Sequence, residues 1–247
     1  MQTMIIAHRG ASEQAPENTM PAFDLAWRMG SEGIETDVQL TKDNVPILIH
    51  DERINRTTNG RGYVKDYTYH ELIQLDSGQW FNPSFSGTKI ITLEQFLNWI
   101  KDKPLYLNIE LKNNKIDYKG LELAVLELIA HYKVANRTTL STFNPNSVNR
   151  LHKLNPTIDS ALLLSKRKSS NLVQHAKALG ANALHIKYRM LTPEIVEACR
   201  RESMALRVYT VNSSKHMLRC FQLGCTAIFT DIPDKALHFR KLYEDHH

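Results

Sequence analysis

Apolar residues recur along the chain in two patterns that alternate with each other. Short apolar runs of about four to eight residues are typical of buried strands, and segments with apolar residues about every three to four positions are typical of amphipathic helices. The strand-like runs lie at 4–7, 33–40, 45–49, 105–111, 138–142, 158–164, 183–186, 205–211 and 226–229. The helix-like segments begin near residues 19, 93, 121, 145, 171, 193, 214 and 233, and we expect Asn18 or Thr19 to cap the first of them. This alternation indicates parallel strands joined by crossover helices.

The number of strand–helix units narrows the fold class. If run 45–49 is an accessory strand, the remaining runs give eight β/α units, and 247 residues is near the size of one such barrel. An open doubly wound sheet is the competing architecture, but no Gly-rich turn follows the first strand, which disfavours its dinucleotide-binding form. We therefore predict an α/β fold, a (β/α)8 TIM barrel, with residues 1–247 as a single domain.

Residues 52–88 interrupt the alternation of strands and helices. They are rich in Gly, Asn, Thr, Tyr and Asp, and only a short patch at 70–75 has helical character. A connection of this length is uncommon unless it has a function of its own. We predict a small inserted segment after the second β unit, within the barrel domain and near a functional site.

Polar residues gather where the predicted strands end. In a TIM barrel the carboxyl ends of the strands meet at one face, and that face carries the active site. The residues at these ends are His8 and Arg9, Glu35 and Asp37, His50 and Asp51, Asn108, Glu110 and Lys112, Ser141 and Phe143, Ser165, His185 and Lys187, Tyr209 to Asn212, and Thr230 and Asp231. Polar residues at one end of apolar strands are hard to reconcile with a solvated surface, so we expect a functional site at this face.

Carboxylates in two of the strands indicate a metal site. Glu35 and Asp37 share one face of the strand at 33–40, because successive side chains of a strand point to opposite faces. Two ordinary acids on an exposed edge strand are the alternative reading of this stretch. Together with Glu110, these acids can hold one Mg²⁺ or Ca²⁺, since both cations prefer oxygen ligands.

Four basic residues near the same strand ends suggest phosphoryl chemistry. Arg9 and Lys112 add positive charge, and an arginine can bind a phosphate through two parallel hydrogen bonds. His8 and His50 can act as general acid and base near neutral pH. A cation, an arginine and two histidines match phosphoryl transfer, which requires charge neutralisation and proton movement. The sequence has neither a G-x-S-x-G elbow nor a Walker loop.

Composition excludes several classes of protein. Hydrophobic residues make up 42% of the chain, which is enough for a substantial core. The formal charge of +5 is modest and the longest basic run is 166–168, so we expect no nucleic-acid partner. Three cysteines without CxxC spacing fit a reducing compartment. With no leader and no apolar stretch of about 18 residues, we expect a cytoplasmic protein without stable membrane insertion.

Six short motifs occur in order over nearly the whole chain. They are His8-Arg9-Gly10, Pro16-Glu17-Asn18-Thr19, Glu35-Thr36-Asp37-Val38, His50-Asp51, Glu110-Leu111-Lys112 and Thr230-Asp231-Ile232-Pro233. Each motif alone is weak, but the set with these spacings resembles the glycerophosphodiester phosphodiesterases, in particular the short cytoplasmic bacterial members. The resemblance implies a TIM barrel with an inserted segment after the His-Asp motif.

The resemblance also implies a reaction and a set of roles. The reaction is metal-dependent hydrolysis of glycerophosphodiesters, such as glycerophosphocholine and glycerophosphoethanolamine, to glycerol 3-phosphate and an alcohol. A related mechanism uses the substrate's own 2-hydroxyl and forms a cyclic phosphate first. It implies that His8 and His50 are the acid–base pair. It implies that Arg9 and Lys112 bind the phosphate, and that the metal is held by three acids, Glu35, Asp37 and Glu110.

Other residues near the strand ends are candidates for supporting roles. Phe143 and Tyr209 are candidates for substrate contact; the family often has Trp at the position of Tyr209. His185 is a further candidate, although it can equally be a satisfied core side chain. We expect Glu17 to orient Arg9 or its loop. Asp51 can either support the residues of the site or bind the metal, and we favour the supporting role.

Two other functions remain as alternatives. A lipase like phospholipase C or sphingomyelinase D shares the barrel and the acid–base logic, but no amphipathic membrane-binding stretch is evident. A non-catalytic barrel that binds a phosphodiester would not need the acid–base pair. The oligomeric state (monomer or homodimer), the metal, and the assignment of acid and base to the two histidines stay open.

Overall fold

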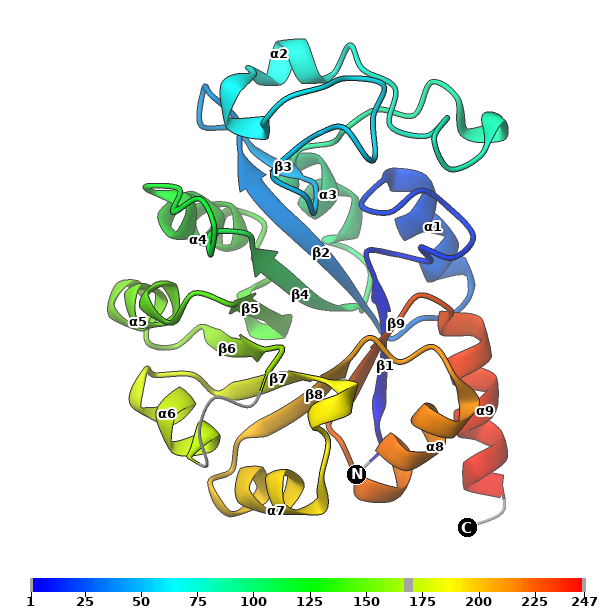
Figure 1. Cartoon of the computed structure of the whole chain (residues 1–247), viewed down its shortest axis with the longest axis vertical. Helices are drawn as coiled ribbons and strands as arrows, with labels where there is room; N and C mark the ends of the chain where they lie inside the picture. The colour runs from blue at the N-terminus through cyan, green and yellow to red at the C-terminus, as the bar shows by residue number, and fades with distance from the viewer. Residues whose placement is uncertain (1, 167–170, 246–247) are drawn as a thin grey trace.

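The computed structural model describes residues 2–166 and 171–245, and in these residues eight parallel strands close into a barrel that helices surround (Figure 1). The strands are β1 (Met4–His8), β2 (Gly33–Leu40), β3 (Pro46–Leu48), β4 (Tyr106–Leu111), β5 (Thr138–Thr142), β6 (Asp159–Leu164), β7 (Ala183–Lys187), β8 (Ala205–Tyr209) and β9 (Ala227–Thr230). The barrel order is β1-β9-β8-β7-β6-β5-β4-β2, and the pairing of β1 with β2 closes it. The predicted TIM barrel is confirmed.

The helices follow the strands as the periodicity predicts. They are α1 (Met20–Arg28), α2 (Tyr69–Leu72), α3 (Leu93–Ile100), α4 (Leu121–His131), α5 (Pro145–Leu154), α6 (Leu172–Ala178), α7 (Pro193–Arg201), α8 (Ser214–Leu223) and α9 (Pro233–Asp245). Short 3₁₀ turns lie at Val64–Asp66, Pro83–Phe85, Ala135–Arg137 and Tyr188–Met190. None of the helices in the part of the chain described here is both long and apolar enough to cross a membrane.

Two apolar clusters fill the space between the barrel and its helices. One lies against α6 to α9 and includes Leu184, Val208 and Ile228 from the strands. The other lies against α1, α3 and α4 and includes Ile34 and Ile109. The apolar face of each strand thus packs on helices, which leaves the opposite face of β2 and β4 to point into the barrel.

The segment 52–88 forms a separate layer over β2, β3 and α3, at the top of Figure 1. The accessory strand β3 pairs antiparallel with β2, and its residue Ile47 packs with Ile54, Val64 and Leu72 of the segment. The predicted helical patch is the short helix α2, whose N-terminal Thr68 forms a capping box. The segment is therefore held by its own small apolar cluster.

The first helix begins differently from the sequence prediction. Thr19 occupies the N-cap position of α1 but makes no side-chain cap bond, because its hydroxyl donates to the carbonyl of Pro16. Asn18, the other predicted cap, uses its amide on Asp37 of β2 instead. The predicted side-chain cap is wrong because these two side chains stabilise the loop and the strand.

Gly10 occupies a turn that has no room for a side chain. Its φ is +83°, and a Cβ atom there would lie 2.6 Å from the carbonyl carbon of Ala22. We expect Gly10→Ala to lower the free energy of unfolding by about 3 kcal/mol or more, as measured by urea unfolding. The matched control is Gly87→Ala, where φ is +88° and nothing lies within 4 Å. It should cost only about 1 kcal/mol, and equal losses in the two variants would refute the steric explanation.

Candidate active site

Three carboxylates from two neighbouring strands converge inside the mouth of the barrel. Glu35 and Asp37 come from β2, and Glu110 comes from β4, where it is the register partner of Asp37. One oxygen of each side chain lies within 4.8 Å of an oxygen of the others, and all three residues are buried. The structure thus brings together the three predicted metal ligands.

The carboxylate cluster is electrostatically uneven. Burial raises the pKa of Glu35 well above its usual value, and repulsion from Asp37 and Glu110 adds to this effect. Burial also acts to raise the pKa of Asp37, but nearby positive side chains, with Arg9 the strongest, hold it well below its usual value. Glu35 is therefore the carboxyl that resists ionisation, and Asp37 is the one that stays charged.

Two cationic side chains border the cluster. The Arg9 Nε atom lies 3.1 Å from Asp37 Oδ2, and its Nη1 lies 2.9 Å from Glu17 Oε1. The Lys112 Nζ atom lies 2.7 Å from Glu110 Oε1 and 3.8 Å from Asp37 Oδ1. Although burial opposes ionisation of both bases, the neighbouring carboxylates raise the pKa of Arg9 and of Lys112, so both stay charged.

The donor set fits a divalent cation. Asp37 Oδ1 is buried and has no hydrogen-bond partner among the described residues, which leaves its lone pairs for another ligand. Three carboxylates and two cationic side chains leave one net negative charge when all are ionised. A divalent cation would turn this into one net positive charge, which matches the single negative charge of a phosphodiester.

A left-handed backbone at Arg9 turns the chain at the end of β1. The φ of Arg9 is 58°, and its N–H donates to Glu35 Oε2 at 2.8 Å. Buried Asn18, later in the same loop, contacts both Arg9 and β2. Its N–H donates to the Arg9 carbonyl, and its Nδ2 donates to Asp37 Oδ2 at 2.9 Å. The loop between β1 and α1 is therefore fixed to the carboxylate strand, and such backbone conformations are common at functional sites.

His8 ends β1 and is held by an aspartate from the last strand end. Its Nδ1 lies 2.7 Å from Asp231 Oδ1, which also accepts from the Ser12 hydroxyl at 2.9 Å. Burial raises the pKa of Asp231, but its bonds from His8, Asn212 and Ser12 lower it to about 2. An ionised Asp231 keeps Nδ1 of the neutral ring protonated, which leaves Nε2 as the nitrogen that can exchange a proton.

His50 has the same kind of partner from its own loop. Its Nδ1 lies 2.7 Å from Asp51 Oδ1. Burial raises the pKa of Asp51, but hydrogen bonds from Arg56 and His50 lower it to about 2. Each predicted catalytic histidine therefore has a carboxylate on Nδ1, an arrangement that fixes both the tautomer and the ring orientation.

A buried glutamine fixes the turn that carries His50. Gln39, from β2, donates through Nε2 to the carbonyls of Ile49, His50 and Asp51 at 3.1, 3.1 and 2.8 Å. Its Oε1 accepts from the Tyr118 hydroxyl at 3.0 Å. Gln39 thus shares a strand face with Glu35 and Asp37 and connects their strand to the turn of His50.

Removal of the Tyr118 hydroxyl should destabilise the protein. In Tyr118→Phe the buried Oε1 of Gln39 would lose its donor, and we expect a loss of about 1–2 kcal/mol in the free energy of unfolding. Urea unfolding measures this loss. The control is Tyr63→Phe, because the Tyr63 hydroxyl accepts only an exposed bond from Arg53 and its loss should cost about 0.5 kcal/mol or less. A smaller loss for Tyr118→Phe than for Tyr63→Phe would contradict the role of this bond.

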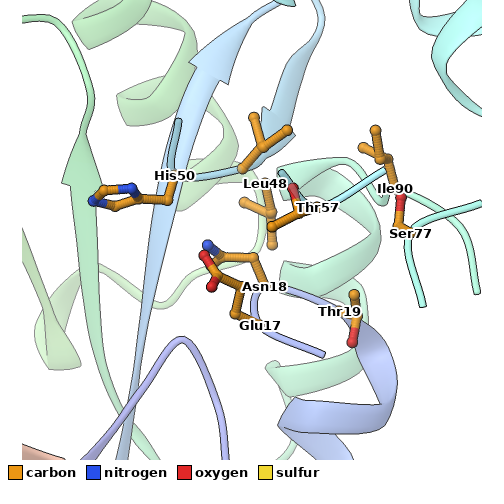
Figure 2. A pocket seen from close by; sticks show the side chains of 9 residues that line it. Glu17, Asn18, Thr19, Leu48, His50, Thr57, Ser77 and Ile90 are labelled. Carbon is orange, nitrogen blue, oxygen red and sulfur yellow. The ribbon is translucent and has the colours of Figure 1, made fainter. Parts of the chain in front are cut away.

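A small cavity of about 10 Å³ lies behind His50, between the α1 loop and the inserted segment. Figure 2 shows the His50 ring pointing away from the other labelled side chains, so the cavity is on the far side of the turn from the ring. This volume has room for about one water molecule and not for a substrate. Its lining residues are Glu17, Asn18, Thr19, Leu48, Ile49, His50, Thr57, Ser77 and Ile90.

Two aromatic side chains stand beside Lys112. The rings of Phe143 and Tyr209 meet edge to face at 6.1 Å, and the Lys112 Nζ lies 5.8 Å from the centre of the Phe143 ring. The Tyr209 hydroxyl donates to the Leu164 carbonyl at 2.9 Å. Burial raises the pKa of Tyr209 above its usual value, and the charge of Glu110 adds to this effect. These predicted substrate-contact residues form an apolar wall next to the charged groups.

His185 lies elsewhere. It has no exposed surface, its Nε2 is 3.0 Å from Nη1 of Arg207, and its ring packs 5.1 Å from that of Phe229. Burial and the positive charge of Arg207 lower its pKa well below the usual value, so it stays neutral. The structure does not bring His185 to the carboxylates, and its surroundings correspond to the predicted alternative, a core side chain.

Three residues support the site in ways that the sequence did not predict, although the sequence carried a signal for each. Asp231 follows the end of β9, Gln39 alternates with the two acids of β2, and Asn18 lies in a motif that precedes α1. Each was visible as a polar residue near a strand end or site loop. The hydrogen-bond partner of each residue could not be predicted, because the partners of Asp231 and Asn18 come from other strands and Gln39 binds the backbone across a turn.

The barrel and the buried carboxylate cluster at its mouth define the class of the protein, a TIM barrel with a candidate metal site. Comparison with known proteins specifies the family. Residues 8–235 match the model of the glycerophosphoryl diester phosphodiesterase family, and the chain belongs to that family. The resemblance predicted from the six motifs is confirmed, and the protein is an enzyme that hydrolyses phosphodiesters.

Two bacterial relatives match almost end to end. A glycerophosphodiester phosphodiesterase of Caldanaerobacter subterraneus subsp. tengcongensis is 39% identical over 241 residues, which cover 96% of this chain and 98% of the relative. One of Bacillus altitudinis is 40% identical over 242 residues, with 97% and 98% covered.

Solved structures agree with the fold. A phosphodiesterase of Oleispira antarctica, in complex with the product sn-glycerol-3-phosphate, has a TM-score of 0.89 and 29% identity, with 97% of both chains covered. A glycerophosphodiester phosphodiesterase of Agrobacterium tumefaciens has a TM-score of 0.83 and 29% identity, with 94% of this chain and 98% of that chain covered.

Proposed function

We propose that this enzyme hydrolyses small glycerophosphodiesters, such as glycerophosphocholine and glycerophosphoethanolamine, to glycerol 3-phosphate and an alcohol, with one bound Mg²⁺ or Ca²⁺. The observation that carries the proposal is the buried cluster of Glu35, Asp37 and Glu110, with a cationic side chain on either side. The product named for the Oleispira antarctica structure supports the glycerol 3-phosphate part.

Substrate binding follows from the charges. The three carboxylates would hold the cation, and a bound divalent cation would neutralise charge on the phosphoryl oxygens. Arg9 and Lys112 would bind the phosphate from the two sides of the cluster, with the arginine presenting N–H groups in a planar fork. The wall of Phe143 and Tyr209 would contact the carbon skeleton of the substrate and limit the entry of water.

The two histidines would move the protons. One takes a proton from the attacking hydroxyl through Nε2, and the other gives a proton to the leaving alcohol oxygen as the P–O bond breaks. Asp231 and Asp51 hold the rings of His8 and His50 in the required orientation and stabilise the imidazolium form. If the attacking group is the 2-hydroxyl of the substrate, a 1,2-cyclic glycerol phosphate forms first and water then opens it.

A substrate panel tests the proposal. Purified protein is given glycerophosphodiesters, lysophosphatidylcholine micelles and sphingomyelin vesicles with Mg²⁺ or Ca²⁺, and products are identified by ³¹P NMR. We expect glycerol 3-phosphate from the small diesters, with 1,2-cyclic glycerol phosphate visible early if the substrate hydroxyl attacks. Turnover of the lipids alone would indicate a lipase, and binding of diesters without turnover would indicate a non-catalytic barrel; either result would overturn the proposal.

A further inference from the structure

One arginine of the inserted segment grips two carboxylates at once. The Arg56 Nε and Nη2 atoms lie 2.7 and 3.3 Å from Oδ2 and Oδ1 of Asp51. Its Nη1 and Nη2 lie 2.7 and 2.8 Å from Oε2 and Oε1 of Glu17. A planar guanidinium can make two such forked contacts, whereas the ammonium of lysine is a point donor that cannot.

Both of these carboxylates also touch residues of the site. Asp51 Oδ1 is 2.7 Å from Nδ1 of His50, and Glu17 Oε1 is 2.9 Å from Nη1 of Arg9. An unbroken chain of charged hydrogen bonds therefore runs from Arg9 to His50, and Arg56 is its middle member. Among the described residues, it is the one member of this chain that comes from the segment 52–88.

The backbone around Arg56 is firmly placed. Ile54 is fully buried in the apolar cluster of the segment, and the two residues after Arg56, Thr57 and Thr58, are buried as well. The Thr58 hydroxyl donates to the Ile54 carbonyl at 2.7 Å, which closes the turn. The guanidinium is therefore presented from a rigid turn, although its side chain is 43% exposed.

We propose that Arg56 is a positioning residue, which fixes Asp51 and thereby the ring of His50. In this arrangement the inserted segment supplies part of the catalytic apparatus. Arg56 itself does not touch the predicted metal ligands Glu35, Asp37 and Glu110. In our proposal it does not touch the substrate either. Its contact with Glu17 connects the segment to the loop of Arg9. Arg9 also has a contact with Asp37 that does not involve Arg56. The inference rests on the proposed function, because it assigns proton transfer to His50.

The geometry predicts a kinetic signature. Arg56→Ala should lower kcat at least about tenfold, which is within the usual contribution of an oriented acid or base, and should change KM less than about threefold. Arg56→Lys should recover little, because a lysine cannot hold both carboxylates. Guanidinium at tens of millimolar should restore part of the kcat of Arg56→Ala and leave that of the wild type unchanged. The matched control is Arg53→Ala, since Arg53 is exposed in the same segment and contacts Tyr63.

A spectroscopic measurement separates this inference from the proposed function. In ¹⁵N NMR of the histidine rings, the His50 signal should show a single Nδ1–H tautomer in the wild type and an average of tautomers in Arg56→Ala. If the wild type turns over no diester while this tautomer change occurs, the proposed function fails and the positioning role stands. An unchanged tautomer, or an Arg56→Ala kcat within twofold of that of an active wild type, would overturn the positioning role.

Discussion

Replacement of His50 by alanine should lower kcat about 10³-fold, because the variant loses one of the two groups that transfer a proton in the transition state. The ring of His50 bonds to Asp51 and is partly exposed, so its loss should cost little stability. Asp37, Glu35 and Glu110 do not depend on it for their position, and metal affinity should stay within about threefold. Steady-state kinetics and calorimetric metal titration measure the two effects.

The control for this variant is His70→Ala, since His70 is exposed in the short helix α2 of the inserted segment. Its kcat should equal that of the wild type. Turnover by His50→Ala at more than about a tenth of the wild-type rate would remove His50 from the reaction, and His8 with Asp231 would then be the remaining acid–base candidate.

Glu35→Gln should abolish tight metal binding. The amide keeps the shape of the side chain and can still accept the Arg9 N–H, but it removes one negative oxygen ligand from the buried cluster. We expect the affinity for Mg²⁺ or Ca²⁺ to fall at least about 100-fold. Even the loss of a residue that only hydrogen-bonds to a metal ligand lowers metal affinity about 10- to 100-fold. Activity should fall with it. Glu127→Gln, at an exposed position on α4, should leave the affinity unchanged.

The same variant gives a second readout that a purely structural role of Glu35 would not produce. Because burial and its carboxylate neighbours raise the pKa of Glu35, ionisation of this group costs free energy in the metal-free fold. That cost increases as the pH rises above the ordinary range of a carboxyl group, and the neutral glutamine avoids it. Metal-free Glu35→Gln should therefore be at least as stable as the wild type in urea at pH 7, and a marked loss of stability would contradict the cluster electrostatics.

The fold could be predicted because the hydrophobic pattern of each segment agrees with the secondary structure and the burial of that segment. The apolar runs become strands, and the segments after them become helices that bury the same residues. The expectation that the site lies at the carboxyl ends of the strands also identified Glu35, Asp37 and Glu110. It succeeded because register partners on neighbouring parallel strands, such as β2 and β4, lie at the same height in the barrel. Local periodicity is enough for these features.

Depth within the barrel was not predictable, and His185 shows why. His185 and Arg207 are register partners and lie in the middle of β7 and β8, whereas His8 is the last residue of β1. An apolar run in the sequence shows that a polar residue lies near the end of a strand. Whether that residue reaches the open end of the barrel depends on how neighbouring strands are staggered, which the run does not show. His185 has no exposed surface and contacts Arg207 instead of the carboxylates.

The hydrogen-bond partners of Arg56 and Gln39 could not be predicted from the sequence for a different reason. Arg56 lies in a segment with no periodicity, and its two partners are 5 and 39 residues away. Gln39 has a strand position that any buried polar residue could occupy, and its role depends on a turn that returns to the end of β2. Such contacts follow from the closed barrel and not from local pattern.

The most direct test of the central claim is a metal titration of the reaction itself. Protein is stripped with EDTA and desalted, and glycerol 3-phosphate release from glycerophosphocholine is followed as Mg²⁺ or Ca²⁺ is added back. We expect no release without a cation, and a rate that saturates when one cation is bound per chain at the cluster of Glu35, Asp37 and Glu110. Full activity in excess EDTA would contradict a cation-dependent reaction at this cluster.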